Sequence, residues 1–123
     1  MIELNEDRHL HNIAVLMKPD GSFDYCQLFD QGAGLLSDTT LDYPMDMDPI
    51  TMIDEVNGKT LCDSFDAALD AAEKLYGQHL CFHFKKNDVS NLLHNEMVYD
   101  DVTKNRVETI ILEQMRKYMY LFK

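Results

Sequence analysis

The sequence predicts an α+β fold, in which a β-hairpin near the N-terminus precedes a mostly helical remainder. The hairpin is predicted by an apolar run at 13–17, a turn-forming Lys18-Pro19-Asp20-Gly21 and a β-prone run at 22–28. Helices are predicted where apolar residues recur at intervals of three and four, at 65–75 and 107–122. A chain of 123 residues has the length of one domain at most.

The first of these helices has recognisable signals at both ends. Asp63 or Ser64 can accept a bond from the free backbone N–H groups of the first turn, and Gly77 suits the position after a helix. The stretch 80–84 alternates only weakly and is compatible with a short strand or with the start of a helix. The apolar face between the two ends consists of Phe65, Ala68, Leu69, Ala72 and Leu75.

Two more helices are expected after residue 85. Asn87 or Asp88 can cap a short helix that extends to Met97. Residues 99–101 provide the cap and the acidic first turn of a final helix, and basic residues lie near its negative C-terminal end. The apolar stripe of this last helix consists of Val107, Ile110, Ile111, Met115, Tyr118 and Phe122.

Charge and composition favour some classes of protein over others. The net charge of −11 at pH 7 disfavours direct binding to nucleic acid or to an anionic membrane, because both are bound by clustered Lys and Arg. No apolar run approaches the ~20 residues that a membrane helix needs. Three cysteines, odd in number and far apart, do not predict a disulfide framework. With no secretory signal at the start, these features predict a cytoplasmic protein.

Polar residues gather at one end of the predicted hairpin. Asp7 and Asn12 precede its first strand, and Asp30 follows its second strand. Because a hairpin places its two ends side by side, we expect these three side chains to lie together. Two carboxylates and an amide oxygen are hard ligands of the kind that Mg²⁺ accepts while it keeps waters and substrate phosphates.

The spacing of these residues is typical of phosphoryl transfer by kinases. There, an Asp accepts or orients the proton of the substrate hydroxyl, and an Asn five residues later binds Mg²⁺. A second Asp, in an Asp-x-Gly turn after a short hairpin, binds the metal ions that bridge the phosphates. Asp7 and Asn12 have the first spacing, and Asp30-Gln31-Gly32 has the second arrangement.

These motifs resemble those of a known family. The segments Asp7-Arg8-His9-Leu10-His11-Asn12 and Phe29-Asp30-Gln31-Gly32-Ala33-Gly34-Leu35 look like the C-terminal catalytic region of HipA-like serine/threonine kinases. These kinases are toxin components of bacterial toxin–antitoxin pairs. The resemblance is sharp over residues 6–38 and general beyond them. It implies a helical kinase C-lobe that begins with the catalytic loop and the hairpin.

The resemblance also implies roles for individual residues. Asp7 would be the catalytic aspartate, and Asn12 and Asp30 would bind Mg²⁺ and, through it, the co-substrate ATP. His9 would pack inside, orient the loop and contribute to the cofactor site. Phosphoinositide kinases carry a similar pair of motifs, but Gln31 replaces their Phe. A lipid kinase is therefore a minor alternative.

A working kinase also needs a phosphate loop, a Lys that contacts the phosphates and its Glu partner, all N-terminal to the catalytic loop. Only six residues precede Asp7, so we expect a single partial domain that is inactive alone. The expected partners are an N-terminal lobe or an antitoxin-type protein, together with a protein substrate. Loss of a lobe would expose apolar surface near the hairpin and Leu35-Leu36 and could lead to self-association.

Other interpretations remain open at this stage. The chain could be a non-catalytic interaction module or pseudokinase remnant that binds a partner where the N-terminal lobe would lie. The charged residues Glu6, Asp7 and Arg8 could belong to an ordinary charged turn. His9 and His11, with the nearby carboxylates, could bind zinc. His79 and His83 have the spacing of one helix face but lack the Glu of a zincin motif.

Overall fold

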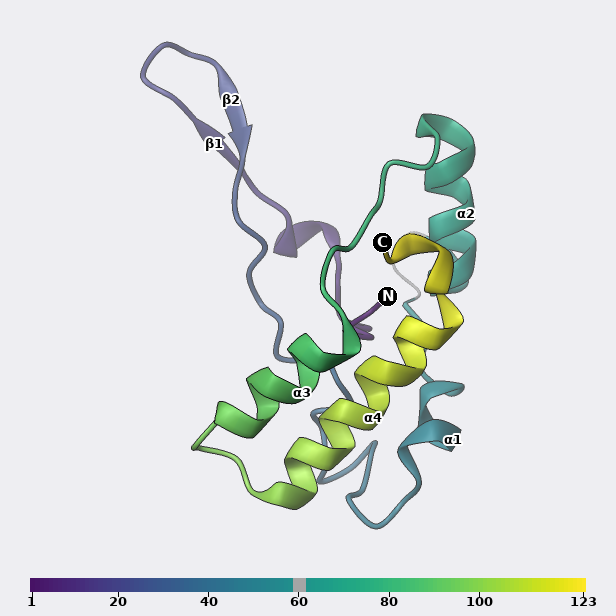
Figure 1. Cartoon of the computed structure of the whole chain (residues 1–123). Helices are drawn as coiled ribbons and strands as arrows, with labels where there is room; N and C mark the ends of the chain where they lie inside the picture. Colours follow the sequence, from purple (N-terminus) through teal and green to yellow (C-terminus); the bar gives the residue numbers. More distant parts are fainter. Residues whose placement is uncertain (59–61) are drawn as a thin grey trace.

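The structure is a computed structural model that describes residues 1–58 and 62–123. Within these residues it has a two-stranded antiparallel sheet, four α-helices and two short 3-10 helices (Figure 1), which confirms the predicted α+β class. None of the described helices is both long enough and apolar enough to span a membrane. The elements in chain order are η1 (Leu10–Asn12), β1 (Val15–Met17), β2 (Phe23–Tyr25), α1 (Pro49–Ile53), α2 (Phe65–Tyr76), α3 (Lys86–Asn95), α4 (Asp101–Lys117) and η2 (Met119–Leu121).

The predicted hairpin is present, and it extends away from the helices (Figure 1). Its turn closes through a bond from the Lys18 amide to the Ser22 carbonyl, at 2.8 Å. Gly21 has a φ of 81°, which a residue with a Cβ adopts only with strain. Every residue of both strands is exposed, so the hairpin is held to the body at its base.

Helix α2 begins and ends, and helix α4 begins, where local signals place them; α4 ends at Lys117, so Phe122 of the predicted stripe lies beyond it. The Ser64 hydroxyl accepts from the amide of Ala67 at 3.1 Å, and Gly77 follows α2 with a φ of 80°. The Asp100 carboxylate accepts from the amide of Thr103 at 2.7 Å at the start of α4. The caps of both helices were therefore predicted correctly, because they depend on contacts between near neighbours.

Helix α3 differs from its prediction. It begins at Lys86, and Asp88 lies in its first turn, where its carboxylate accepts from the amide of Lys85 at 2.7 Å. It ends at Asn95, so Met97 lies beyond it and is 93% exposed. An acidic residue at the third helical position can bond back to the residue before the helix. The carboxylate was identified correctly, but its position in the helix was wrong.

Two other segments acquire their structure from tertiary contacts. Helix α1 was not predicted, although Asp48 caps it and Pro49 occupies its first turn. The stretch 80–84, for which the sequence was compatible with a strand or a helix, is neither a helix nor an extended strand. It forms one parallel bridge between Phe82 and Phe122, whose rings stack with their centroids 5.0 Å apart.

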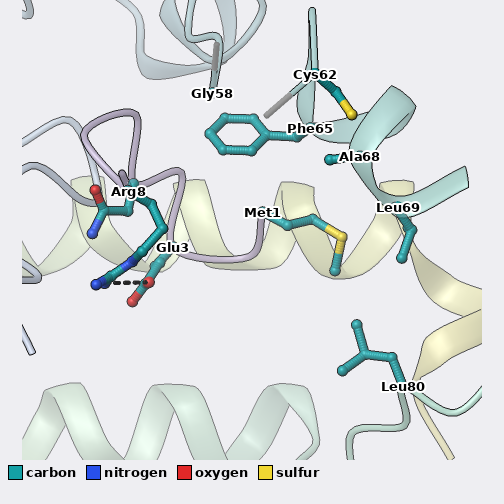
Figure 2. A pocket seen from close by; sticks show the side chains of 10 residues that line it. Met1, Glu3, Arg8, Gly58, Cys62, Phe65, Ala68, Leu69 and Leu80 are labelled. Carbon is teal, nitrogen blue, oxygen red and sulfur yellow. Dashed lines mark ion pairs between the residues drawn. The ribbon is translucent and has the colours of Figure 1, made fainter. Parts of the chain in front are cut away.

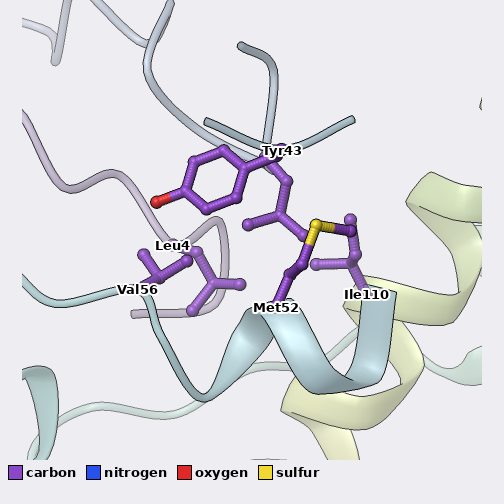
Figure 3. Close-up of a cluster of buried hydrophobic side chains, with 6 residues drawn as sticks. Leu4, Tyr43, Met52, Val56 and Ile110 are labelled. Atoms are coloured by element: carbon purple, nitrogen blue, oxygen red, sulfur yellow. The ribbon is translucent and has the colours of Figure 1, made fainter. Parts of the chain in front are cut away.

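A small core connects the N-terminal segment to the helices (Figure 3). Leu4 lies just before the predicted catalytic loop, and Leu36 lies just after the predicted metal loop. Leu36 is only 2% exposed and Leu35 is half-buried, so the expectation that this pair forms an exposed patch was wrong. Burial of these leucines fixes the position of both loops against α1 and α4. The buried members of the core are Leu4, Leu36, Tyr43, Met52, Val56 and Ile110.

Arg106 on α4 attaches the loop before α1 to this core. Its guanidinium donates to the carbonyls of Tyr43 at 2.8 Å and Pro44 at 3.0 Å. The side chain is 7% exposed, and burial lowers the pKa of its guanidinium below the ordinary value. The Tyr43 hydroxyl, in turn, donates to both oxygens of Glu6, at 3.0 and 2.9 Å. The chain Arg106–Tyr43–Glu6 therefore runs from α4 to the edge of the predicted catalytic loop.

We expect Arg106→Met to lower the free energy of unfolding by about 2–4 kcal/mol, because it leaves the buried carbonyl of Tyr43 and the partly buried carbonyl of Pro44 without this donor. Urea denaturation at pH 7 measures this loss. Arg116→Met is the matched control, since the Arg116 side chain is 73% exposed and bonds only to Glu113. The control is expected to change stability by less than about 0.5 kcal/mol. Equal losses in both variants would contradict this role for Arg106.

Asp66 on α2 makes stability depend on pH. The Tyr118 hydroxyl and then the Lys117 ammonium hold the pKa of the Asp66 carboxyl below its ordinary value of 3.8. Because the folded pKa is depressed, the stabilisation is fully present above about pH 4 and is lost as the pH falls through the folded value.

We therefore expect Asp66→Asn to lower the urea midpoint at pH 6 and to reduce the loss of stability between pH 6 and pH 2. The effect is small, because the Asp66 side chain is 51% exposed. Asp70→Asn on the exposed side of the same helix serves as the control. An unchanged slope of stability against pH in Asp66→Asn would count against this contact.

Candidate catalytic and metal-binding site

Arg8 brings together the two segments that the sequence singled out. Its guanidinium donates to the carbonyl of Asn12 at 3.1 Å and to that of Phe29 at 2.6 Å. It also donates to the side-chain oxygen of Gln31 and lies 3.5 Å from the Asp30 carbonyl. These acceptors are up to 23 residues away along the chain. The planar guanidinium fork thus joins the end of the 7–12 loop to the 29–31 segment.

Asn5 provides a second link between the same segments. Its amide nitrogen donates to the Asp30 carbonyl and to the Gln31 side chain, both at 3.2 Å. Its amide oxygen accepts from the backbone N–H of Asp7 at 3.1 Å. Asn5 is 3% exposed, so these bonds also satisfy a polar side chain that folding has removed from water.

Asn12 is buried, and its side chain has a defined orientation. Its amide nitrogen donates to the backbone carbonyl of Asp7 at 3.1 Å. Because this bond uses the amide nitrogen of Asn12, the amide oxygen is the atom of this side chain that could bind a cation. The Asp7 carboxylate is 62% exposed and can therefore meet a substrate from solvent. Sequence spacing alone indicated neither the bond nor the burial.

His9 belongs to the 7–12 loop and contacts the side chains of Asp7 and His11. Its Nε2 is 3.8 Å from an Asp7 carboxylate oxygen, and its ring meets that of His11 edge-on with centroids 5.4 Å apart. Within the described residues its Nδ1 is buried without a hydrogen-bond partner. His9 is half-buried and His11 is exposed. A ring held in this way can orient the Asp7 side chain.

Asp30 adopts a left-handed backbone conformation with a φ of 56°, and its side chain is exposed. Asp tolerates this region better than most residues, and such conformations are common at functional sites. Gly32 is not sterically required, since an added Cβ would meet only an Asp30 oxygen at 3.9 Å. A Cβ at Gly34, in contrast, would lie 3.1 Å from the Glu3 carbonyl. The segment that begins at Asp30 therefore packs tightly against the N-terminal segment at Gly34, two residues after Gly32 of the motif.

The histidines of the loop were the alternative ligands for zinc. Among residues 1–58 and 62–123, no group of three or more His, Cys, Asp or Glu is arranged to bind a metal ion. Asp7, Asn12 and Asp30 are the oxygen donors that the sequence predicts for Mg²⁺.

An apolar cavity of about 320 Å³ lies beside Arg8 (Figure 2). Phe65 and Leu69 of α2 and Leu80 line it, together with residues of the N-terminal segment. The only carboxylate paired with Arg8 in the described residues is that of Glu3, at 3.9 Å, which is a weak contact. The strong bonds of Arg8 are therefore those to the two loops.

Comparison with protein-family models, with curated proteins and with solved structures finds no match to this chain. Its function is therefore argued from the site itself.

We expect Arg8→Lys to loosen the site although it keeps the positive charge. A lysine ammonium cannot span the carbonyls of Asn12 and Phe29 and the Gln31 side chain at once. Stability in urea is expected to fall by about 1–3 kcal/mol.

Hydrogen exchange gives a second measurement of the same change. The amide of Cys26, which bonds to Ala14 at 3.0 Å at the base of the hairpin, is expected to exchange faster in Arg8→Lys. Lys18→Met is the control, because it removes only the exposed ion pair with Asp24 at the far end of the hairpin. Unchanged exchange at Cys26 in Arg8→Lys would refute the anchoring role.

Proposed function

We propose that this chain carries the catalytic and metal-binding loops of a HipA-like serine/threonine kinase. The observation that carries the proposal is the Arg8 guanidinium, which joins the Asp7–Asn12 loop to the Asp30-Gln31-Gly32 segment. The spacing of these motifs resembles that of kinases, and Arg8 makes the two motifs parts of one site. The helices that follow would then form the C-terminal lobe of the kinase.

Each residue has a role in this proposal. The exposed Asp7 carboxylate accepts the proton of a Ser or Thr hydroxyl as its oxygen attacks the γ-phosphorus of ATP, and ADP leaves. The Asn12 amide oxygen and the Asp30 carboxylate would hold Mg²⁺, which would supply positive charge to stabilise the phosphate oxygens. His9 positions Asp7 through the contact at 3.8 Å.

Kinase catalysis also requires groups that hold the β- and γ-phosphates. A glycine-rich phosphate loop is not identified in these 123 residues, so activity would require a nucleotide-binding lobe in addition to them. The hairpin offers a surface for such a lobe. In its register Val15 faces Tyr25 and Met17 faces Phe23, so these four side chains share one apolar face. They are 57–83% exposed.

The same apolar face favours a second function, that of a non-catalytic interaction module. A two-stranded hairpin with one apolar face is marginally stable alone, so a protein partner that covers it would stabilise it. Under this alternative the kinase motifs serve only to shape the base of the hairpin. A lipid-kinase function is a lesser alternative, since Gln31 stands where those kinases have Phe.

We expect Mn²⁺, used as a paramagnetic probe of the Mg²⁺ site, to broaden NMR resonances of residues 7–12 and 29–32 together. Binding is expected to be weak, because only two charged ligands are available without phosphates. Asp30→Asn should weaken the broadening, whereas Asp20→Asn at the turn of the hairpin should leave it unchanged. Broadening confined to the acidic segment 42–48 would rule out the assigned site.

Activity separates the two candidate functions. With a nucleotide-binding lobe supplied in trans, the kinase hypothesis predicts transfer of labelled phosphate from ATP to a Ser hydroxyl. Asp7→Asn and Asp30→Asn should each reduce the rate by at least about a hundredfold while the fold, followed by circular dichroism, is retained. A lobe that binds tightly without any transfer of phosphate would instead favour the interaction module.

A further inference from the structure

Left-handed backbone is concentrated around the proposed metal loop. In the part of the chain that the structure describes, the residues other than glycine with a positive φ are Leu4 at 52° and Asp30, Leu35 and Leu36 at 56°. Asp adopts this region more readily than most residues, but a leucine adopts it only with strain, because its Cβ crowds the following carbonyl. All of these residues lie in the two segments that carry the proposed site.

Two neighbouring glycines do not adopt this conformation. Gly32 and Gly34 lie in the same segment, yet the positive φ values fall on Leu35 and Leu36. Glycine adopts a positive φ without strain, so local backbone preference would place a left-handed residue at a glycine. The conformation of the two leucines must therefore be imposed by contacts with other parts of the chain.

Burial and one backbone bond hold the two leucines in this conformation. Leu36 is buried in the hydrophobic core, and Leu35 packs against the same core from a half-buried position. The Leu35 N–H donates to the Glu3 carbonyl at 2.6 Å, which ties the pair to the N-terminal segment. A Cβ at Gly34 would lie 3.1 Å from the same carbonyl, so the two segments are already in close contact there. These contacts offset the strain at the two leucines.

Short hydrogen bonds connect the leucines to the proposed metal loop. The Gly34 N–H donates to the carbonyl of Gln31 at 3.1 Å, and the Ser37 hydroxyl donates to the carbonyl of Gly32. Gln31 and Gly32 directly follow Asp30. The chain from Asp30 to Ser37 is therefore one compact turn, and a change of φ near its end would move its beginning.

We propose that Leu35 and Leu36 are positioning residues for the proposed site. Their left-handed backbone holds the turn that begins at Asp30 in the orientation in which the Asp30 carboxylate meets a divalent cation. Both leucines act through Asp30 and not by contact with the cation. The inference rests on the proposed function, because it concerns the same metal-binding carboxylate. It adds a conformational requirement at two residues that the motif spacing does not include.

Side-chain packing and backbone conformation lead to opposite expectations at Leu35. Ile has nearly the volume of Leu and would keep the apolar contacts, but its branched Cβ disfavours a positive φ. Gly removes the contacts and accepts the conformation. Ala removes nearly the same contacts as Gly but carries the Cβ that opposes a positive φ. The pair Leu35→Gly and Leu35→Ala therefore isolates the contribution of the backbone.

The experiment measures Mn²⁺ binding to the whole chain through the broadening of NMR resonances of residues 29–32. We expect Leu35→Ile to bind Mn²⁺ more weakly than the unsubstituted chain by about fivefold or more, and Leu35→Ala to bind it more weakly than Leu35→Gly by a similar factor. Leu112→Ile is the control, because Leu112 is half-buried within α4, and it is expected to change binding by less than about twofold. Circular dichroism checks that each variant is folded. If Leu35→Ile does not fold, the comparison of Leu35→Gly with Leu35→Ala decides.

A second measurement does not depend on the metal. A positive φ brings the N–H and Hα protons of one residue close together, which gives a strong nuclear Overhauser effect within that residue. For Asp30 we expect this effect to be strong in the unsubstituted chain and in Leu35→Gly, and weak in Leu35→Ile and Leu35→Ala. A strong effect at Asp30 in all of these proteins would overturn the proposal.

The metal measurement has outcomes that overturn the proposal as well. Equal Mn²⁺ binding by Leu35→Gly and Leu35→Ala, or stronger binding by Leu35→Ile than by Leu35→Gly, would show that packing alone is sufficient. If the unsubstituted chain binds no Mn²⁺ at residues 29–32, the proposed site is refuted, and the effect at Asp30 alone decides whether Leu35 positions this residue. Mn²⁺ binding that is weakened by Asp30→Asn but unaffected by Leu35→Ile would refute only the positioning role.

Discussion

The guanidinium of Arg8 is the interaction on which the arrangement of this protein depends. It is a rigid, permanently charged fork, and it bonds to the carbonyls of Asn12 and Phe29 and to the side chain of Gln31. The hairpin between these residues is exposed along both strands and could not hold its ends together alone. Arg8 therefore determines that the residues before and after the hairpin form one site.

The hydrophobic core also fixes the two segments that Arg8 joins. Leu4 and Leu36, one on each of the two segments, are buried in the same cluster as Met52 of α1 and Ile110 of α4. Burial of a leucine contributes roughly 1.5–3 kcal/mol, which favours one fixed position for each segment. The site is thus built from loops, but each loop is attached at its outer end, through Leu4 or Leu36, to the helical part of the chain.

Exposed apolar surface is prominent at two places on this protein. The face of the hairpin that carries Phe23 and Tyr25 is apolar, which suits a protein lobe that covers it permanently. The cavity beside α3 is lined by apolar side chains together with two carboxylates and two cations. Under the proposed kinase function, the lobe that covers the hairpin would supply the nucleotide.

Features that depend on near neighbours could be predicted from the sequence. The turn at Gly21, the Ser64 cap, the end of α2 at Gly77 and the Asp100 cap each arise from contacts within about five residues. The motif residues of the proposed site were chosen from their local spacing along the chain, and their roles stay a prediction. What the sequence by itself determined is therefore where most elements begin and end, and which side chains are available for chemistry.

The tertiary structure decided the features that join distant residues. Asn5 has no local signal, yet it bonds to Asp30, 25 residues away. Leu36 was expected at the surface and is buried, and the tight approach of chains occurs at Gly34 instead of Gly32. The physical reason is that a buried amide or guanidinium must find acceptors wherever the fold places them, and only the folded chain specifies which carbonyls are in reach.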